Sequence, residues 1–215
     1  MKKIAVVLSG CGVFDGSEIH EATLTLLALS QNELEYQCFA PDKDQYHVIN
    51  HLTKEISNEK RNVLVESARI ARGNIQALTE LYAKDYAGVV FPGGHGAAKN
   101  LSSFGYQSDD YYVDEDVVRV IKEFHESRKP IAALCIAPVL LAKVLGGQIT
   151  IGKDVSTAKK VTQAGAKHIE KEYHEVAVDE LNRIITNPCY MLADSIYKVY
   201  VGVDAAIQTM MGLMR

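Results

Sequence analysis

The chain has 215 residues, a length that favours one α/β domain over two. Its 47% apolar and 23% charged residues fit a folded globule and exclude a disordered chain. The net charge of −4, with basic residues dispersed along the chain, argues against a nucleic-acid partner. We therefore expect a single domain over residues 1–215.

The cysteines and apolar runs indicate the compartment. Four cysteines are widely spaced: Cys11, Cys38, Cys135 and Cys189. A domain of this size needs no disulfide framework, so reduced thiols are expected. No secretion signal is visible, and the longest apolar run, residues 131–142, is shorter than the roughly 18 residues that a membrane span requires. These features predict a cytoplasmic protein, or an organellar one with its leader removed, without membrane association.

Short apolar runs alternate with amphipathic segments along the chain. Strands are predicted at residues 4–8, 34–39, 86–91, 131–134 and 148–151. Helices are predicted at residues 18–30, 62–72, 114–127, 139–145, 157–164 and 194–211, the first with Ser17 or Asp15 as its N-cap. Strand-like pieces at 168–172, 175–178 and 183–186 are candidates for antiparallel additions. This order predicts a three-layer α/β/α sandwich around a mostly parallel, flavodoxin-like sheet.

In such sheets, ligands bind where strands end and helices begin. Four segments qualify: residues 9–18, 92–97, 134–138 and 186–189. The glycines of the first segment, at positions 10, 12 and 16, miss the dinucleotide-binding spacing by one residue, and no phosphate-binding loop or zinc spacing is present. We therefore expect neither a cofactor nor a metal.

Cys135 stands where a buried strand turns directly into a helix, as the nucleophile of hydrolase folds does. Ala133 and Ala137 are small enough for a tight turn, and Pro138 is tolerated in the first turn of a helix. The unpaired N–H groups of that helix would favour a thiolate. The alternative is a small buried apolar residue. Spacing alone leaves both interpretations open.

Two further segments offer partners for this thiol. Glu18 begins the helix after the first strand, where a carboxylate either caps the helix or, if the two strands are near neighbours, reaches the thiol and carries protons. The glycine-rich segment that begins at Pro92 can turn backbone N–H groups toward an oxyanion. His95 within it is either a base or an ordinary loop histidine.

Taken together, these segments resemble the ThiJ/PfpI superfamily, within the class I glutamine-amidotransferase-like fold. More narrowly, the chain is similar to its ElbB-type, isoprenoid-biosynthesis-associated glyoxalase-like branch. The stretches that carry the likeness span nearly the whole chain: SGCGVFDGSEIHE at 9–21, CFAPDK at 38–43, VINHL at 48–52, GGHGAAKNL at 93–101, CIAP at 135–138 and YMLA at 190–193.

The resemblance implies glutathione-independent conversion of small 2-oxoaldehydes to 2-hydroxy acids, such as glyoxal to glycolate, without a cofactor. It implies Cys135 as nucleophile, Glu18 as its carboxyl partner, and the N–H groups of Gly94 and Ile136 as the oxyanion site. It also implies a homodimer. Further candidates for lining the site are Cys11, Gly93, His95, Asn187 and Pro188.

Ile136 stands where many members of the superfamily have histidine, which disfavours glutamine hydrolysis. Two other functions use the same thiol and stay open. One is a protein deglycase or small amidase. The other is a redox-responsive or partner-binding protein with little catalysis, in which Cys135 is oxidised to a sulfinic acid.

Overall fold

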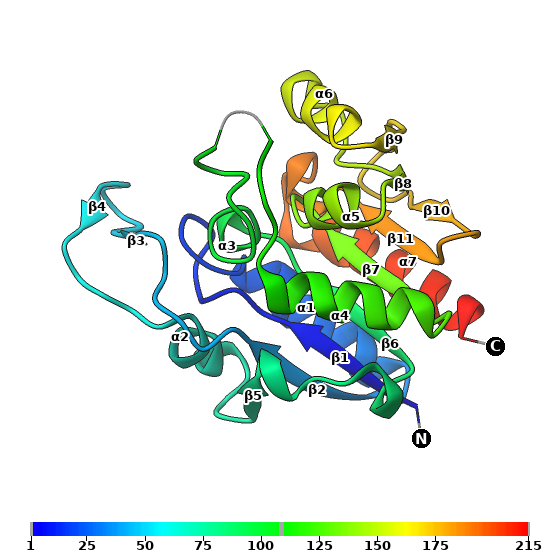
Figure 1. Ribbon diagram of the computed structural model, residues 1–215, viewed down its shortest axis with the longest axis horizontal. Coiled ribbons are helices and arrows are strands. Elements are labelled where there is room, and N and C mark those ends of the chain that lie inside the picture. The colour runs from blue at the N-terminus through cyan, green and yellow to red at the C-terminus, as the bar shows by residue number, and fades with distance from the viewer. Residues whose placement is uncertain (1, 108–109, 215) are drawn as a thin grey trace.

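The computed structural model describes residues 2–107 and 110–214 and contains a central seven-stranded sheet (Figure 1). In spatial order its strands are β10 (Ala177–Asp179), β11 (Ile184–Asn187), β7 (Ile131–Leu134), β6 (Gly88–Phe91), β1 (Lys3–Val7), β2 (Glu35–Ala40) and β5 (Ile75–Ala77). All neighbours pair in parallel except β10 and β11, which pair antiparallel. The predicted mostly parallel sheet with an antiparallel addition is therefore confirmed.

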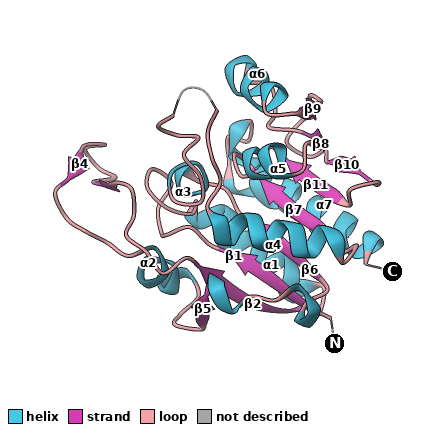
Figure 2. Ribbon diagram, in the orientation of Figure 1, coloured by secondary structure: helices cyan, strands magenta, loops and turns pink. Residues whose placement is uncertain are grey.

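Helices cover both faces of this sheet and complete the three layers (Figure 2). One face carries α4 (Glu115–Glu126) and α5 (Pro138–Val144), and the other carries α1 (Ile19–Gln31), α2 (Val63–Ile70) and α7 (Ile196–Leu213). Because both faces are covered, every residue of β6 and β7 is buried, as continuous apolar runs require.

Three smaller pieces lie outside these layers. An antiparallel hairpin, β3 (Val48–Ile49) with β4 (Ile56–Ser57), projects away from the sheet at the left of Figure 1. The parallel pair β8 (Gly147–Ile149) and β9 (Ala166–His168) flanks α6 (Val155–Gln163). The short helix α3 (His95–Lys99) follows β6. Single-turn 3₁₀ helices occur at Leu78–Glu80, Ala83–Asp85 and Cys189–Met191.

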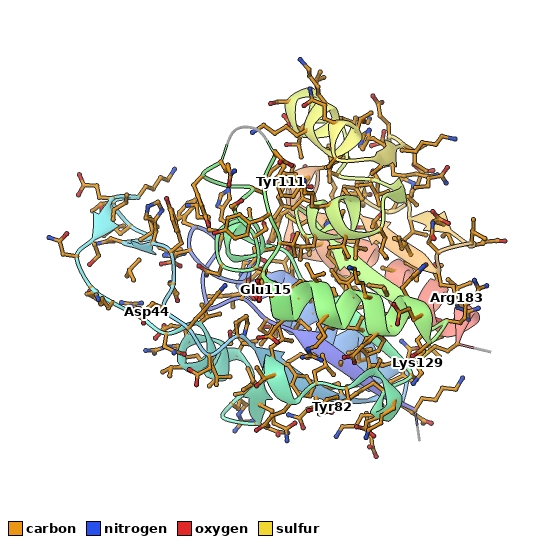
Figure 3. The ribbon with its side chains drawn as sticks, viewed as in Figure 1. Asp44, Tyr82, Tyr111, Glu115, Lys129 and Arg183 are labelled. Carbon is orange, nitrogen blue, oxygen red and sulfur yellow. The ribbon has the colours of Figure 1, made fainter. Side chains whose placement is uncertain are left out.

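Side chains also join loops and turns to the neighbouring elements (Figure 3). Tyr111 donates a hydrogen bond from its hydroxyl to the carbonyl of Val139 in α5, at 2.7 Å. The Lys129 ammonium group donates to the carbonyl of Ala83, at 2.6 Å, and joins the turn before β7 to the turn before β6.

Local differences from the predicted elements have physical causes. The N-cap of α1 is Glu18, not Ser17 or Asp15, because the Glu18 carboxylate accepts the N–H of Glu21. The strand predicted at 168–172 ends at His168, before a run of charged residues. The elements that prediction missed, β3, β4, β5 and α3, have at most five residues each. Such short segments carry no detectable periodicity.

No helix within the described residues is long and apolar enough to cross a membrane.

Candidate functional site

The order of the strands creates a crevice at the carboxyl edge of the sheet. From β1 the chain moves outward to β2 and β5, and then returns to the other side of β1 as β6. Ligands bind at such a reversal of strand order. The loops after β1, β6 and β7 all end at this edge, and β6 separates the other two strands. The topology therefore brings these three loops to one edge of the sheet, as the sequence predicts.

Cys135 occupies the turn between β7 and α5 in a left-handed backbone conformation, with φ of 58°. A residue with a Cβ adopts this region at a cost of about 1 kcal/mol, and such strain is concentrated at functional sites. The neighbouring strand holds the turn, because the Cys135 N–H donates to the carbonyl of Asn187 at 2.9 Å. Pro138 starts α5, as predicted. Cys135 as a whole residue is 7% exposed.

The carboxyl group beside this thiol belongs to Glu21. A Cβ on Gly93 would lie 2.4 Å from the Cβ of Cys135 and 2.5 Å from Oε2 of Glu21, so the two side chains meet over a glycine that leaves them room. Glu21 is fully buried, and its Oε1 accepts the N–H of Tyr190 at 3.1 Å. Its Oε2 is buried and has no oxygen or nitrogen partner among the described residues.

Burial raises the pKa of Glu21 to about 8, despite the opposing hydrogen bond from the Tyr190 N–H. The nearby Glu18 carboxylate acts in the same direction as burial. At pH 7 most Glu21 side chains are therefore neutral, and the group can donate a proton as well as accept one.

Glu18 lies next to this pair but has a different role in the structure. Its Oε2 caps α1 by accepting the Glu21 N–H at 2.7 Å, and its own N–H donates to the carbonyl of Gly93 at 2.9 Å. The side chain also lines the cavity in front of Cys135. The sequence interpretation that chose Glu18 as the thiol's partner missed Glu21. The detectable signal is that Glu21 falls on the buried face of α1, with Ala22, Thr25 and Ala28.

Two opposing effects set the pKa of Cys135. Burial and the charge that Glu21 carries when ionised raise it well above its ordinary value. The N–H groups of Gly94 and Ile136, both directed at the sulfur, lower it. These are the two N–H groups that the family resemblance implies for an oxyanion site. Protonation of Glu21 removes the repulsion and so favours the thiolate.

A second thiol lies behind the first. Cys189 is fully buried, and both its N–H and its thiol donate to Oδ1 of Asn187, at 2.8 Å and 3.1 Å. Burial raises its pKa well above the ordinary value, and the charges of Glu21 and Cys135 add to that effect. Cys189 is therefore a protonated residue of the interior.

A cavity of about 580 Å³ opens in front of Cys135. Its walls come from loops and helices far apart in the sequence: Val13, Glu18, Gly94, His95, Ala98, Lys99, Phe104, Gly105, Cys135, Ile136, Thr157, Lys160, Tyr190 and Met191. The sequence interpretation names Glu18, Gly94, His95, Cys135 and Ile136 from this set. It misses the residues from α6 and from positions 104–105, because those segments carry no recognisable motif.

Three expected lining residues lie elsewhere. The half-buried Cys11 thiol lies among Glu66, Arg69 and Asp15, and burial raises its pKa. Asn187 is buried and holds Cys189, while Pro188 packs near Gly152. Both belong to the end of β11, which supports the Cys135 turn, and neither lines the cavity. Gly93 lies beneath the Cys135 side chain, as described above.

His95 lines the cavity, but its surroundings do not make it a strong base. Its ring stacks against Phe14, with centroids 6.2 Å apart. Burial and the charge of Lys99 lower its pKa, so the imidazole is neutral at pH 7.

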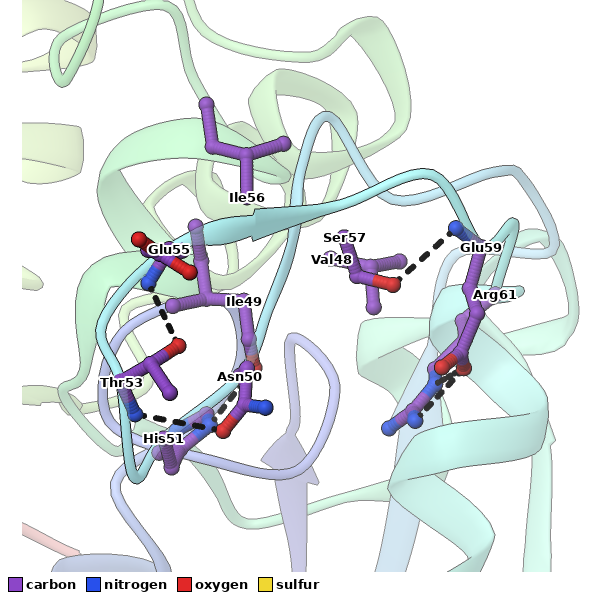
Figure 4. A pocket seen from close by; sticks show the side chains of 10 residues that line it. All are labelled: Val48, Ile49, Asn50, His51, Thr53, Glu55, Ile56, Ser57, Glu59 and Arg61. Carbon is purple, nitrogen blue, oxygen red and sulfur yellow. Dashed lines mark hydrogen bonds and ion pairs between the residues drawn. The ribbon is translucent and has the colours of Figure 1, made fainter.

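A second cavity, of about 450 Å³, lies along the β3–β4 hairpin (Figure 4). Its lining contains no cysteine, and its polar groups bind one another: Asn50 accepts the N–H of Thr53, and Arg61 pairs with Glu59. Among the described residues, this second cavity therefore offers no thiol nucleophile.

Comparison with known proteins agrees with this geometry. The chain is 46% identical to glutamine amidotransferase-like class 1 domain-containing protein 3, mitochondrial, of Homo sapiens, over 98% of this chain and 83% of that protein. It is 38% identical to the mitochondrial ES1 protein of Danio rerio, over 92% and 80%. The cytoplasmic location expected from the sequence is contradicted, because these relatives are named as mitochondrial.

Solved structures share the fold. An isoprenoid biosynthesis protein with an amidotransferase-like domain from Ehrlichia chaffeensis superposes with a TM-score of 0.90 and 37% identity, over 98% of this chain and 99% of that one. A 24 kDa rapid encystment protein of Francisella tularensis, 14% identical, superposes with a TM-score of 0.62 over 99% of each chain. The family model that matches residues 3–188 is that of the DJ-1/PfpI family. With the elbow cysteine, the glycine-rich loop and these relatives in agreement, the chain belongs to the DJ-1/PfpI family.

Proposed function

We propose that the protein is a glutathione-independent glyoxalase-type enzyme that converts small 2-oxoaldehydes to 2-hydroxy acids, with Cys135 as nucleophile and Glu21 as the group that moves protons. The observation that carries the proposal is the contact of two buried, titratable side chains, of which Cys135 lines a cavity and Glu21 is a carboxyl with a free oxygen and a pKa of about 8.

The proposed reaction needs no oxidant. The Cys135 thiolate attacks the aldehyde carbon and forms a C–S bond, and the carbonyl oxygen takes the proton of neutral Glu21 to give a hemithioacetal and a Glu21 carboxylate. The N–H groups that lower the pKa of the thiol, from Gly94 and Ile136, stabilise the oxyanion on the way.

Glu21 then takes a proton from the former aldehyde carbon and returns one to the neighbouring carbon, while the hydroxyl proton passes from the first oxygen to the second, which leaves a thioester of the 2-hydroxy acid. Water hydrolyses the thioester and regenerates the thiol, so the net change is the addition of one water. A group whose pKa lies near the working pH is suited to both proton transfers.

The test compares glycolate formation from glyoxal, without glutathione, in wild type and in Cys135→Ser, Glu21→Gln and Glu18→Gln. We expect no turnover above background for Cys135→Ser. We expect a loss of roughly 100-fold or more for Glu21→Gln, because general acid–base groups contribute at least that much. Glu18→Gln keeps an oxygen that can cap α1, so we expect it to lose less turnover than Glu21→Gln.

Cys11→Ser is the matched control, since Cys11 lies outside the cavity, and we expect it to retain wild-type turnover. Turnover of wild type no faster than that of Cys135→Ser would refute the proposal. Mild peroxide treatment read by intact mass tests the redox function, which would gain if Cys135 took up two oxygens while turnover stayed negligible. The homodimer implied by the resemblance stays a prediction.

A further inference from the structure

The cavity is much larger than glyoxal requires. Cavities of roughly 300–1,000 Å³ hold ligands of drug size, and this one measures about 580 Å³, whereas glyoxal has only two carbons and two oxygens. Beyond the thiol, its wall is apolar over Val13, Ala98, Phe104 and Met191. A substrate that fills this space has a chain beyond its aldehyde end.

The cavity lining carries charged groups of both signs on different elements. Glu18 lines the cavity beside Cys135, and the buried Glu21 carboxyl lies behind Cys135, outside the lining. The ammonium-bearing side chains of the lining are Lys99 from α3 and Lys160 from α6, on the wall that also contains Phe104 and Gly105.

Lys160 carries a charge that no carboxylate balances in the described part of the chain. The lysines that form salt bridges there are Lys43, Lys143, Lys153, Lys171 and Lys198. The Lys160 nitrogen instead lies 5.3 Å from the centre of the Phe104 ring, a cation–π contact that holds the charge at the cavity wall.

The ammonium group of Lys99 already has one hydrogen-bond partner. Its nitrogen donates to the carbonyl of Phe14 at 3.2 Å; burial lowers the pKa of Lys99, and the charge of Asp15 opposes that shift. Its hydrocarbon stem packs beside Gly105, where an added Cβ would lie 2.9 Å from Cγ of Lys99. Lys99 has two further N–H donors for a ligand.

From this arrangement we infer that the substrates are 2-oxoaldehydes with an anionic group, a carboxylate or phosphate, at the far end of their chain, bound by Lys160 with Lys99. The inference rests on the proposed function, because the aldehyde end is placed at Cys135. An anion at that wall gains a charge-assisted hydrogen bond, whereas an uncharged chain end leaves the ammonium group without a partner.

The kinetic test uses two substrates of equal chain length. The anionic one is 4,5-dioxopentanoate, which adds water to give 2-hydroxyglutarate, and the neutral one is 2-oxopentanal, which gives 2-hydroxypentanoate. For wild type we expect kcat/KM to be about ten-fold higher for the anionic substrate, as one charge-assisted hydrogen bond supplies. Lys160→Gln should reduce this preference about ten-fold, mainly through KM. Lys159→Gln, an exposed neighbour on the same helix, should preserve the wild-type preference.

A second measurement does not need turnover. Glutarate should slow the alkylation of Cys135 by iodoacetamide, which is followed by peptide mass. The slowing should be stronger in wild type and Lys159→Gln than in Lys160→Gln. Neutral glutaramide should protect all three proteins equally. Phosphate-bearing and carboxylate-bearing competitors of the same length then distinguish the two anion types.

The outcomes separate the two proposals. If no protein turns over either substrate, the glyoxalase function is refuted. If glutarate protection nevertheless depends on Lys160, the anion site is supported. Turnover of both substrates without a preference, unchanged by Lys160→Gln, overturns the anion site and leaves the glyoxalase function standing.

Discussion

Glu21 lies against Cys135, and the missing side chain of Gly93 makes the room for that contact. The two residues come from α1 and from the turn after β7, on either side of the loop that follows β6. One buried carboxyl and one buried thiol in contact cannot both ionise cheaply. The pair therefore holds a proton at neutral pH, and this proton has consequences for stability and reactivity.

The first prediction concerns stability as a function of pH. The pKa of Glu21 rises from 4.5 to about 8 on folding, so between these values the folded chain keeps a proton that the unfolded chain loses. The free energy of unfolding then falls by about 1.4 kcal/mol per pH unit from this group. Its contribution is complete below pH 4.5 and is lost as the pH rises to about 8.

Glu21→Gln has no carboxyl to titrate, so it removes this fall in the free energy of unfolding with rising pH. The variant retains an oxygen that can accept the Tyr190 N–H. We expect urea unfolding to show the variant more stable than wild type at pH 8, with the gap closing toward pH 5. Glu126→Gln, on the exposed end of α4, serves as the control and should show no such trend. A gap that is independent of pH would contradict the raised pKa.

The second prediction concerns the reactivity of the thiol. Above pH 8, ionised Glu21 raises the pKa of Cys135, so less thiolate forms. In a Cys11→Ser background, Glu21→Gln should therefore be alkylated by iodoacetamide faster than its parent at pH 9. The two rates should converge near pH 7, where Glu21 is mostly neutral. Equal rates at pH 9, followed by intact mass, would show that the two groups do not interact.

The third prediction concerns Gly94, which has φ of 98°. A Cβ there would lie 2.3 Å from the backbone nitrogen of Glu18, so an alanine would push the loop after β6 away from the loop after β1. Gly73 has a similar φ of 81° but open space around it. Gly73→Ala gives the cost of a positive φ without a clash, about 1 kcal/mol, whereas Gly94, with ψ of 157°, also lies in a backbone region that only glycine adopts easily. We expect Gly94→Ala to lower the free energy of unfolding by clearly more than that in chemical denaturation. Equal costs would mean that the two loops are not interlocked.

The fourth prediction concerns the cap of α1. Glu18→Ala removes the acceptor of the Glu21 N–H and should cost about 1 kcal/mol of stability, whereas Glu18→Gln should cost less. Thermal unfolding at one pH measures both. If the two variants lose the same amount, the carboxyl contributes by its charge and not by its hydrogen bond.

The fold was predictable because its strands are short, fully buried apolar runs. The strand at 131–134 has the predicted bounds, and α1 and α7 lie within two residues of theirs. The place of Cys135 was predictable for the same reason, since only residues 135–137 separate the buried strand from a proline that starts a helix, which permits little except a tight turn.

The remainder of the site depends on side-chain direction. Glu18 and Glu21 are three residues apart, and only the burial pattern of α1 separates the residue that caps from the one that faces the thiol. Lys160 and Phe104 reach the cavity from segments whose sequences resemble ordinary surface. Cys11 follows β1 at the correct edge, but its side chain points toward α2 residues such as Glu66. Position along the chain does not determine such directions.

The hydrogen bond from the Tyr190 N–H to Glu21 also determines the stage of folding at which the site forms. Its two ends are separated by most of the chain, and the segment that supplies the N–H follows β11, which pairs with β7. During synthesis, α1 emerges long before its partner does, and until then the Glu21 carboxyl has neither that donor nor the burial that raises its pKa. The nascent chain therefore carries an ordinary acid and an ordinary thiol, and the reactive pair exists only once the late strands have docked.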